Sequence, residues 1–473
     1  MNKYQERKGL FDIYDSAMNA VRGDTVVESY LTQASVTGDI YVVAIGKAAT
    51  AMASGAITRF DCADHCQLTG GILITKDGHL PSKPLVTHMG NSFVMIESAH
   101  PIPDQRSLEA GHTLVNILQN LPIGTHLLFL LSGGASSLVE LLPETVSLQE
   151  LQQLNQYLLT SGLAIEVMNE LRQQMSLIKG GGLLNYVCAR KITALYISDV
   201  QGDDINVIGS GLVTEPKQSQ LNMAAILSLD NMSLQISSAS LRQESSLPPK
   251  GDSGLLLKQL PADILALLHQ GNEGRNQSIK KVFDQCYTAE QVVRQDSDGK
   301  KRVGRVTHKI VACLGEALQA ASDFVASQGL ALHHCPTLYG ELTSSAKIIA
   351  STLKAMTPGV MISGGEVTVA LPKNPGQGGR NQSIALAVAS EIAGCNDIIF
   401  MAIGTDGTDG PGTDAGAMVD GETCERGLIQ GLEPMDHLRR ADAGIFLEAT
   451  ADLISSGPTG TNVMDLYIGI KLP

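Results

Sequence analysis

A glycine-rich loop carries Arg380 and Asn381 into the start of an expected helix. The planar guanidinium of an arginine can hold a carboxylate or a phosphate through paired hydrogen bonds. Glycines at such a junction let backbone N–H groups approach an anion, and the helix start adds a partial positive charge. The strand before the loop is expected to end in a Ser-Gly-Gly-Glu turn. Its glycines, Gly364 and Gly365, are candidate phosphate-binding residues. The segment 360–385 therefore predicts an anion site, with an ordinary surface turn as the alternative.

A lysine occupies a comparable position near the beginning of the chain. An apolar strand over 40–45 leads into Gly46 and Lys47, and a helix of small residues follows over 48–57. Ligands of open α/β sheets bind at the carboxyl ends of the strands. Gly46 is therefore a candidate phosphate-binding residue, and Lys47 is a candidate site residue rather than a solvated turn lysine. The turn is not a P-loop, because GxxxxGK[ST] is absent.

Two more glycine turns predict phosphate contacts. One follows an apolar strand over 126–131, and the other presents a second lysine. An acyl-transfer role for the serines is disfavoured, because GxSxG is absent. The candidate phosphate-binding residues of these two turns are Ser132, Gly133, Gly134, Ser136, Ser137, Lys179, Gly180 and Gly181.

Acidic residues follow two other strands. Asp199 ends the expected strand over 192–198, and Asp406 lies in the loop after the strand over 397–404. Carboxylates at these places can hold magnesium, directly or through water. The acidic loop 405–414 does not have the spacing of a calcium loop. His100, in the segment HPIPD, and Asn381 are candidate substrate-binding residues. The two prolines of the HPIPD segment are equally compatible with a purely structural loop.

The elements that must position these residues suggest an α/β protein of two domains. Repeated strand-turn-helix units indicate a mostly parallel sheet in the first domain, residues 1–240. A helical or linker segment is expected over 241–306, with an exposed stretch at 242–254. The second domain is expected over 307–473, opening with a strand over 309–314. Its last strand, 463–471, could also return to the first domain.

Composition excludes several classes of function. The net charge is −14, from 34 basic and 48 acidic residues, which argues against nucleic acid and anionic membranes as partners. The mean hydropathy is +0.07, and neither a membrane span nor a signal peptide is expected, which favours the cytoplasm. Structural zinc is disfavoured. Segments 62–66 and 333–335 each contain cysteine and histidine, but neither has a second pair of ligands at zinc spacing. For the oligomeric state, a homodimer is an open alternative.

Together these groups favour phosphoryl transfer. Cations, glycine amides and scattered aspartates suit a reaction that depends on positioning and charge stabilisation around magnesium. Hydride transfer is disfavoured, because no GxGxxG followed by an acidic residue opens the chain. Glycine turns in both halves imply two nucleotide-fold domains that face each other. We expect the active site in the cleft between them, where closure would exclude water.

Nine motifs along the chain resemble those of one family. They are AIGKAATAM, HPIPD, LSGGASS, SLIKGGGL, SDVQGDD, ISGGEVTV, GGRNQ, AIGTDGTDGPGTDAGA and SGPTGTNVMDLY. In this order they resemble the glycerate 2-kinases of the MOFRL type (class II glycerate kinases). The resemblance implies a Rossmann-like N-terminal domain and a C-terminal α/β domain with the MOFRL region at about 358–467. It also implies transfer of a phosphoryl group from ATP to the 2-hydroxyl of D-glycerate, with Mg²⁺. The family's proposed catalytic pair corresponds to Lys47 and Arg380.

The sequence departs from the family's pattern at two turns. Cys313-Leu314-Gly315 replaces the usual Ser-Asn-Arg, and Gly340 to Thr343 replaces Gly-Glu-Ala-Arg. These changes affect the expected nucleotide or substrate contacts more than the phosphoryl transfer itself. Two alternatives are a hydroxypyruvate reductase and a non-catalytic protein that binds a nucleotide or a sugar acid.

Overall fold

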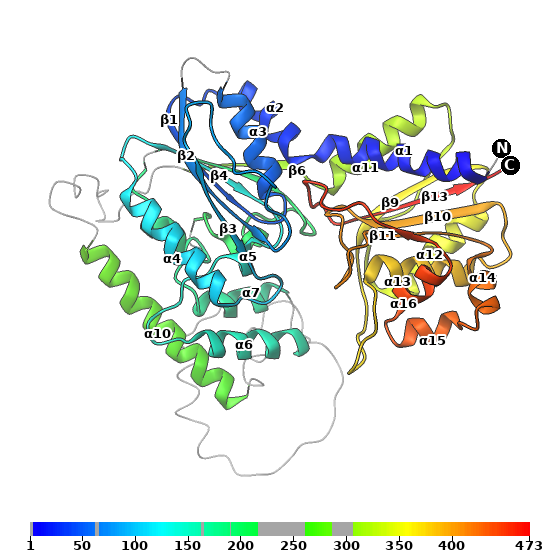
Figure 1. Ribbon diagram of the computed structural model, residues 1–473. Helices are drawn as coiled ribbons and strands as arrows, with labels where there is room; N and C mark the ends of the chain where they lie inside the picture. The colour runs from blue at the N-terminus through cyan, green and yellow to red at the C-terminus, as the bar shows by residue number, and fades with distance from the viewer. Residues whose placement is uncertain (1–2, 62–65, 162–164, 190, 216–260, 286–305) are drawn as a thin grey trace, which may run out of the picture.

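The computed structural model describes residues 3–61, 66–161, 165–189, 191–215, 261–285 and 306–473. In these residues the chain forms two lobes, each built on one β-sheet (Figure 1). No helix in these ranges is long and apolar enough to span a membrane. The expected linker at 242–254 lies outside the described residues, and so do Cys62 and His65.

The first sheet is parallel, as its sequence predicts. It has six strands in the order β3-β2-β1-β4-β5-β6. Their bounds are β1 (Gly38–Ile45), β2 (Cys66–Lys76), β3 (Phe93–Ser98), β4 (His126–Leu131), β5 (Lys191–Ile197) and β6 (Val306–Ala312).

Helices cover both faces of this sheet, which explains why its strands are almost continuously apolar. On β1, Val42 and Ala44 belong to a cluster that includes the small residues of α3 (Ala49–Asp61). Val43 and Ile45 point to the other face and pack with residues of α4 (Gln105–Asn120). The remaining helices of the first lobe are α2 (Gly23–Gln33), α5 (Ala135–Leu138), α6 (Leu148–Thr160), α7 (Ile165–Gln174), α10 (Ala262–Gln285) and the 3-10 helices η1 (Gly182–Tyr186) and η2 (Ile208–Gly211).

The strand β6 corrects the expected start of the second domain. It pairs in parallel with β5 through residues 192–197, so it is the edge strand of the first sheet. The sequence places this strand after a long weakly patterned segment, which suggested a new domain. Strand pairing over such a sequence separation is decided by the sheet edge that is available, and the local pattern does not encode it.

The second sheet is mostly antiparallel, so the expectation of a second nucleotide-binding fold is wrong. Its order is β12-β11-β10-β13-β9-β7, and β8 pairs with β9. The last strand lies between β9 and β10, antiparallel to both, and does not return to the first sheet. The strands are β7 (Leu332–His334), β8 (Leu338–Glu341), β9 (Gly359–Thr368), β10 (Ile398–Gly404), β11 (Gly416–Asp420), β12 (Leu453–Ile454) and β13 (Asp465–Lys471).

The N-terminal helix α1 (Lys3–Val21) packs on the second lobe, against α11 (Leu314–Ser327) and β13 (Figure 1). Arg7 fixes it there by donating to Asp452 at 3.0 Å. The helix α1 therefore packs mainly on the second lobe, although the sequence analysis assigns these residues to the first domain. The other helices of this lobe are α12 (Leu342–Ala355), α13 (Arg380–Glu391), α14 (Thr423–Ile429), α15 (Pro434–Arg439) and α16 (Ala443–Ala449).

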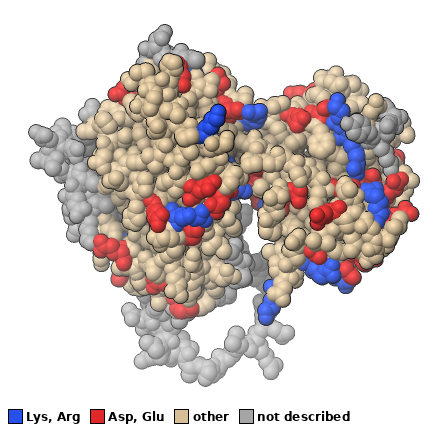
Figure 2. All heavy atoms as spheres, in the orientation of Figure 1, with Lys and Arg blue, Asp and Glu red and all other residues tan. Residues whose placement is uncertain are grey.

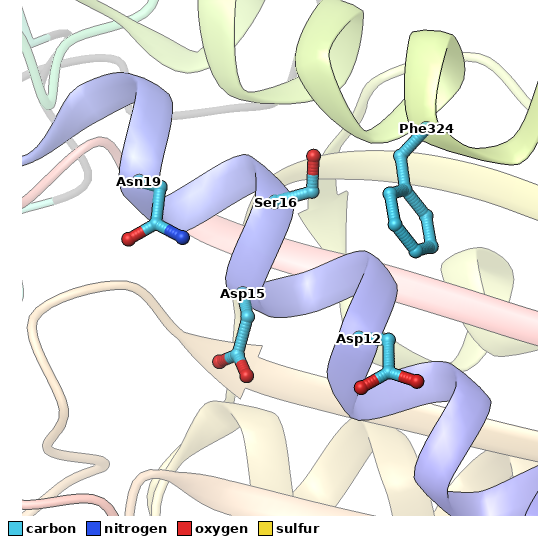
Figure 3. A pocket seen from close by; sticks show the side chains of 5 residues that line it. All are labelled: Asp12, Asp15, Ser16, Asn19 and Phe324. Carbon is cyan, nitrogen blue, oxygen red and sulfur yellow. The ribbon is translucent and has the colours of Figure 1, made fainter. Parts of the chain in front are cut away.

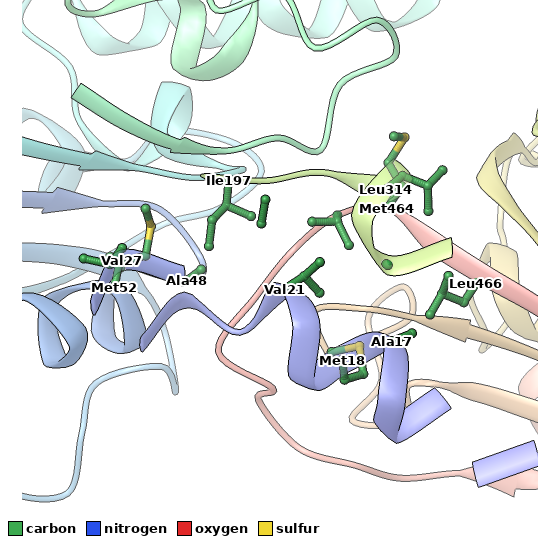
Figure 4. Packing of buried hydrophobic residues seen from close by; sticks show 14 of the residues in the cluster. Ala17, Met18, Val21, Val27, Ala48, Met52, Ile197, Leu314, Met464 and Leu466 are labelled. Atoms are coloured by element: carbon green, nitrogen blue, oxygen red, sulfur yellow. The ribbon is translucent and has the colours of Figure 1, made fainter. Parts of the chain in front are cut away.

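One apolar cluster joins the two lobes. It contains Met52 and Ile197 from the first lobe, Val21 from α1, and Leu314 and Met464 from the second lobe (Figure 4). All five side chains are less than a tenth exposed. A core shared in this way fixes how the lobes meet and holds the carboxyl ends of the first sheet against the loops of the second.

Candidate active site in the cleft between the lobes

Residues at the carboxyl ends of β1, β2 and β5 contact the second lobe. The surface is hollowed between the lobes (Figure 2). Side-chain contacts cross between the lobes here. The Nζ atom of Lys47 lies 2.6 Å from Oδ2 of Asp406. The amide of Asn462 donates to Oδ2 of Asp199 over 2.7 Å. The expected cleft therefore contains residues that the sequence assigns to both halves of the site.

The turn that presents Lys47 is fixed by the backbone. Gly46 has a φ of 130°, and a Cβ atom there would lie 2.2 Å from the hydroxyl of Ser132. That hydroxyl accepts the N–H of Ala48 at 3.0 Å, and the Lys47 N–H donates to the carbonyl of Gly133 at 2.9 Å. Gly46 and Ser132 thus position Lys47, and the Ser132 hydroxyl is used within the turn rather than turned toward a phosphate.

The electrostatics of Lys47 depend on Asp406. Burial alone would raise the pKa of Asp406, but Lys47, the Thr408 amide and Lys76 lower it to about 2. Both carboxylate oxygens have partners, since Oδ1 also accepts the Thr408 N–H at 3.0 Å. Asp406 therefore holds the ammonium of Lys47 and fits poorly as the predicted magnesium ligand.

The glycine turn after β4 lets side chains from three other segments approach closely. A Cβ atom on Gly133 would lie 1.8 Å from Oδ2 of Asp199. One on Gly134, whose φ is 85°, would lie 2.9 Å from the His100 ring and 3.4 Å from Lys47 Cγ. The structure thus brings Lys47, His100 and Asp199 together around this turn, as the sequence analysis expects. A substrate contact of His100 stays a prediction.

Asp199 and His100 in the cleft also have shifted pKa values. Burial, together with the charges of Glu366 and Asp406, raises the pKa of Asp199 to about 6, against the opposing effect of Lys47. Burial and the nearby ammonium groups of Lys47 and Lys76 lower the pKa of His100 to about 3, so its imidazole is neutral at physiological pH. Titratable groups with shifted pKa values that converge in one cleft are typical of active sites.

Arg380 lies on the second lobe and is already paired with carboxylates. Its Nε atom lies 2.6 Å from Oδ2 of Asp465, and its Nη2 donates to Oδ1 of the same residue at 3.1 Å. A third contact joins Nη1 to Glu366. The guanidinium is nevertheless about one third exposed, at 35%. It can therefore contact a ligand in the cleft while its orientation is held by the two carboxylates.

The anion expected at the start of α13 is a carboxylate of the protein itself. Asp409 accepts the N–H groups of Asn381 at 3.0 Å and Gln382 at 2.7 Å. Gly379 admits it, because a Cβ atom there would lie 2.2 Å from its Oδ1. The prediction of an anion-binding helix terminus is correct in its chemistry, but the site is occupied internally. Asn381 is 1% exposed and also donates to Asp465, and its substrate contact stays a prediction.

Gly364 and Gly365 do not form the expected turn, and their assignment to phosphate binding stays a prediction. Both lie inside β9, paired with Leu466 and Asp465 of β13. A Cβ atom would lie 2.8 Å from Leu314 Cδ1 at the first glycine, and 2.0 Å from the Leu338 carbonyl oxygen at the second. These glycines serve close packing inside the strand, a role that the sequence pattern does not distinguish from a strand-ending turn.

The Lys179 turn is also structural. The ammonium is 2.5 Å from Oε2 of Glu140, and the two side chains are only 3% and 0% exposed. The N–H groups of Gly180 and Gly181 donate to the carbonyls of Ser210 and Gly211, at 2.9 and 2.7 Å. A buried carboxylate and backbone oxygens take the donors of these three residues in this structure, and their phosphate contacts stay predictions.

The two serines of the β4 turn also have internal partners. Ser136 Oγ lies 2.7 Å from Ser210 Oγ, and Ser137 donates to the Gly134 carbonyl at 3.0 Å. Ser137 is buried, whereas Ser136 and Gly134 keep partial exposure. A phosphate contact at this turn stays a prediction for Gly133, Gly134 and Ser136.

The sequence analysis missed three residues of the cleft. Lys76 ends β2 and donates to Thr408 at 3.1 Å, and Glu366 and Asn462 contact Arg380 and Asp199. Lys76 could have been found, since it follows an apolar strand just as Lys47 does. Glu366 and Asn462 carry no such pattern.

The two departures from the family's pattern lie at helix starts. Cys313 is the N-cap of α11, where Glu316 accepts its backbone N–H at 2.9 Å. Glu341 caps α12 through the N–H groups of Thr343 and Ser344, at 2.8 and 2.7 Å. Both turns therefore keep a clear structural role.

A shallow hollow of about 390 Å³ lies elsewhere, between α1 and α11 (Figure 3). None of the predicted site residues lines it. Its walls are Asp12, Asp15, Ser16, Asn19 and Phe324. Among the described residues, no group of three or more His, Cys, Asp or Glu side chains could hold a metal ion.

Comparison with known proteins gives the family. Residues 10–243 match a domain of unknown function (DUF4147), and residues 359–465 match the MOFRL family. A D-glycerate 2-kinase of Thermotoga maritima is 32% identical over 98% of both chains. A relative from Agrobacterium vitis with a provisional hydroxypyruvate reductase name is 29% identical, over 98% of this chain and 94% of its own.

The fold has been seen before as well. A crystal structure of glycerate kinase from Thermotoga maritima has a TM-score of 0.73 and 29% identity, and the match covers 99% of this chain and 100% of that one. The family expected from the motifs is thereby confirmed: the chain belongs to the glycerate 2-kinases that carry a MOFRL domain.

Proposed function

We propose that this protein transfers the γ-phosphoryl group of ATP to the 2-hydroxyl of D-glycerate, giving 2-phosphoglycerate and ADP. The observation that supports the proposal is that Lys47 and Asp199 approach the same glycine turn, and that Glu366, which contacts Arg380, raises the pKa of Asp199 by its charge. The 32% identity to a D-glycerate 2-kinase over nearly the full length of both chains supports the same reaction.

In this proposal the two cations neutralise the charge of the transferring group. Lys47 is held by Asp406 in the resting state and is 17% exposed, so a phosphate oxygen can take the place of the carboxylate. Arg380 is oriented by Asp465 and Glu366, and its exposed part faces the phosphoryl group or the glycerate carboxylate. In phosphoryl transfer, positioning and electrostatic stabilisation carry most of the catalysis, so fixed cations are the main requirement.

The donor set allows Mg²⁺ only together with phosphate oxygens. Mg²⁺ in kinase sites is commonly bound by one or two carboxylates, with waters and substrate phosphates as its other ligands. Asp199 is the candidate for this role, because its carboxylate lies just after β5 and Asn462 holds it in place by donating to Oδ2. When bound, the ion would shield the negative charge of the phosphates. The hydrogen bond from the Asn462 amide fixes the direction of the Asp199 carboxylate, which lies two residues after β5.

The test is an ATP-dependent assay over a panel of small hydroxy acids, including D- and L-glycerate, D-lactate and glycolate. We expect ADP formation with D-glycerate, and a product that ³¹P NMR identifies as the 2-phosphate. Formation of the 3-phosphate, or no transfer to any acid, would contradict the proposal. Oxidation of NADH with hydroxypyruvate in the absence of ATP would instead favour the reductase alternative.

A further inference from the structure

The cations near the cleft differ in whether they already have a carboxylate partner. Lys47 is paired with Asp406, and Arg380 is paired with Asp465 and Glu366. In each case an incoming anion must compete with a carboxylate of the protein. A cation without such a partner would bind an anion at a lower cost.

Lys76 is such a cation. Its Nζ donates to the hydroxyl of Thr408 over 3.1 Å, and no carboxylate of the described residues pairs with it within 4.0 Å. The side chain is half-buried. Burying part of an ammonium group costs free energy, because the group loses hydrogen bonds to water. A single neutral acceptor offsets only part of that cost.

Strand register places Lys76 beside Lys47. In the parallel pair of β1 and β2, Ile45 is opposite Ile74, so each lysine lies two residues beyond a matched pair. Neighbouring strands are about 4.8 Å apart, so both lysines leave the same end of the sheet side by side. Thr408, which contacts Lys76, also donates to Oδ1 of Asp406 at 3.1 Å.

The surroundings of this pair of lysines favour an anion. Burial and the charge of Lys47 lower the pKa of Lys76, and Asp406 opposes them. Burial and the charge of Lys76 also lower the pKa of the neighbouring His79. His79 and His100 are therefore both held toward their neutral forms, and the carboxylate of Asp406 interacts with both ammonium groups.

We propose that Lys76 is a further substrate-binding residue, which donates to an anionic oxygen of a molecule bound in the cleft. The shared chemistry is that of a carboxylate or a phosphate, and its two sources are the hydroxy acid and the nucleotide. This inference rests on the proposed function, since it names the cation that holds one of the two substrates. The bound oxygen would take the place of Thr408 or join it.

The competing explanation is that Lys76 only links the lobes through Thr408. Lys76→Met removes the charge and keeps much of the length of the side chain. Thr408→Val removes the hydroxyl acceptor and keeps the ammonium. Lys83→Met removes one positive charge at an exposed position of the following loop, and it controls for the change in net charge.

Steady-state kinetics with each substrate varied separately gives the test. A charge-assisted hydrogen bond predicts that Lys76→Met raises one KM, for D-glycerate or for ATP, by about 10- to 100-fold. Lys76→Arg should recover much of that loss. The substrate whose KM rises identifies the source of the anion. If both KM values stay within twofold of the wild type, or if Thr408→Val reproduces the full effect, the proposal is overturned.

Direct titration calorimetry with D-glycerate and with ADP separates this result from the fate of the proposed function. If the wild type transfers no phosphate to any acid, the proposed function fails, yet weaker binding of either ligand by Lys76→Met still supports Lys76 as an anion-binding residue. Unchanged affinity for both ligands would refute it. Thermal unfolding of each variant checks that it is folded, and Lys76→Gln serves as a second variant if Lys76→Met is not.

Discussion

Replacing Lys179 by methionine separates a structural lysine from a phosphate-binding one. Glu140 would keep the donors Ser176 Oγ, at 2.5 Å, and the Leu141 N–H, at 3.0 Å, but would lose its only cation among the described residues. Removing one partner of a buried ion pair typically costs about 3–5 kcal/mol, because the other charge stays buried without compensation. Since domains are stable by only about 5–15 kcal/mol, this loss should be large and easily measured.

The assay is urea unfolding followed by far-UV circular dichroism, together with KM for ATP. We expect Lys179→Met to lower the unfolding midpoint strongly, and to leave KM for ATP within about twofold under conditions where the variant is folded. The double variant Lys179→Met/Glu140→Gln should recover a large part of the stability, because the unpaired charge is then removed as well. A variant of normal stability whose KM for ATP rises tenfold would refute the reasoning and return Lys179 to the site.

Three other perturbations test the cleft. Lys47→Ala should lower kcat/KM by about 100-fold or more while the unfolding midpoint changes little, and near-normal turnover would contradict its role. Arg380→Ala should lower kcat/KM to a similar extent and also destabilise the protein, since Asp465 is 1% exposed and loses its cation; intact stability would show that the pair contributes little. The kcat/KM of the wild type should fall as the pH drops below about 6, because Asp199 then takes up a proton, and a flat profile down to pH 5 would rule out a need for its ionised form.

The same shift in the pKa of Asp199 has a consequence for stability. Its pKa in the folded protein, about 6, is above the ordinary value of 3.8, so the folded state binds the proton more tightly than the unfolded state. The contribution of this group to stability is therefore complete below pH 3.8 and is lost as the pH rises through 6. A carboxylate that costs stability in its ionised form is consistent with a binding role rather than a structural one.

Some features of this protein were determined by the sequence alone. Near-continuous apolar strands followed by glycine turns predicted the parallel sheet, because a sheet covered on both faces needs apolar residues at every position. The same pattern located Lys47, since the residue after such a strand must emerge at the ligand-binding end. The motif order identified the family before any geometry was known.

Only the tertiary structure decided which donors are free. Lys47, Lys179 and Arg380 follow similar glycine-rich patterns, yet Glu140 neutralises Lys179 in the interior, while Asp406 and Asp465 hold the other two in the cleft. The partners lie between 39 and 359 positions away along the chain, so no local pattern could name them. The start of α13 likewise needed Asp409, which a different loop supplies. Whether a polar group serves the fold or a ligand depends on what fills the space around it, and long-range packing decides that.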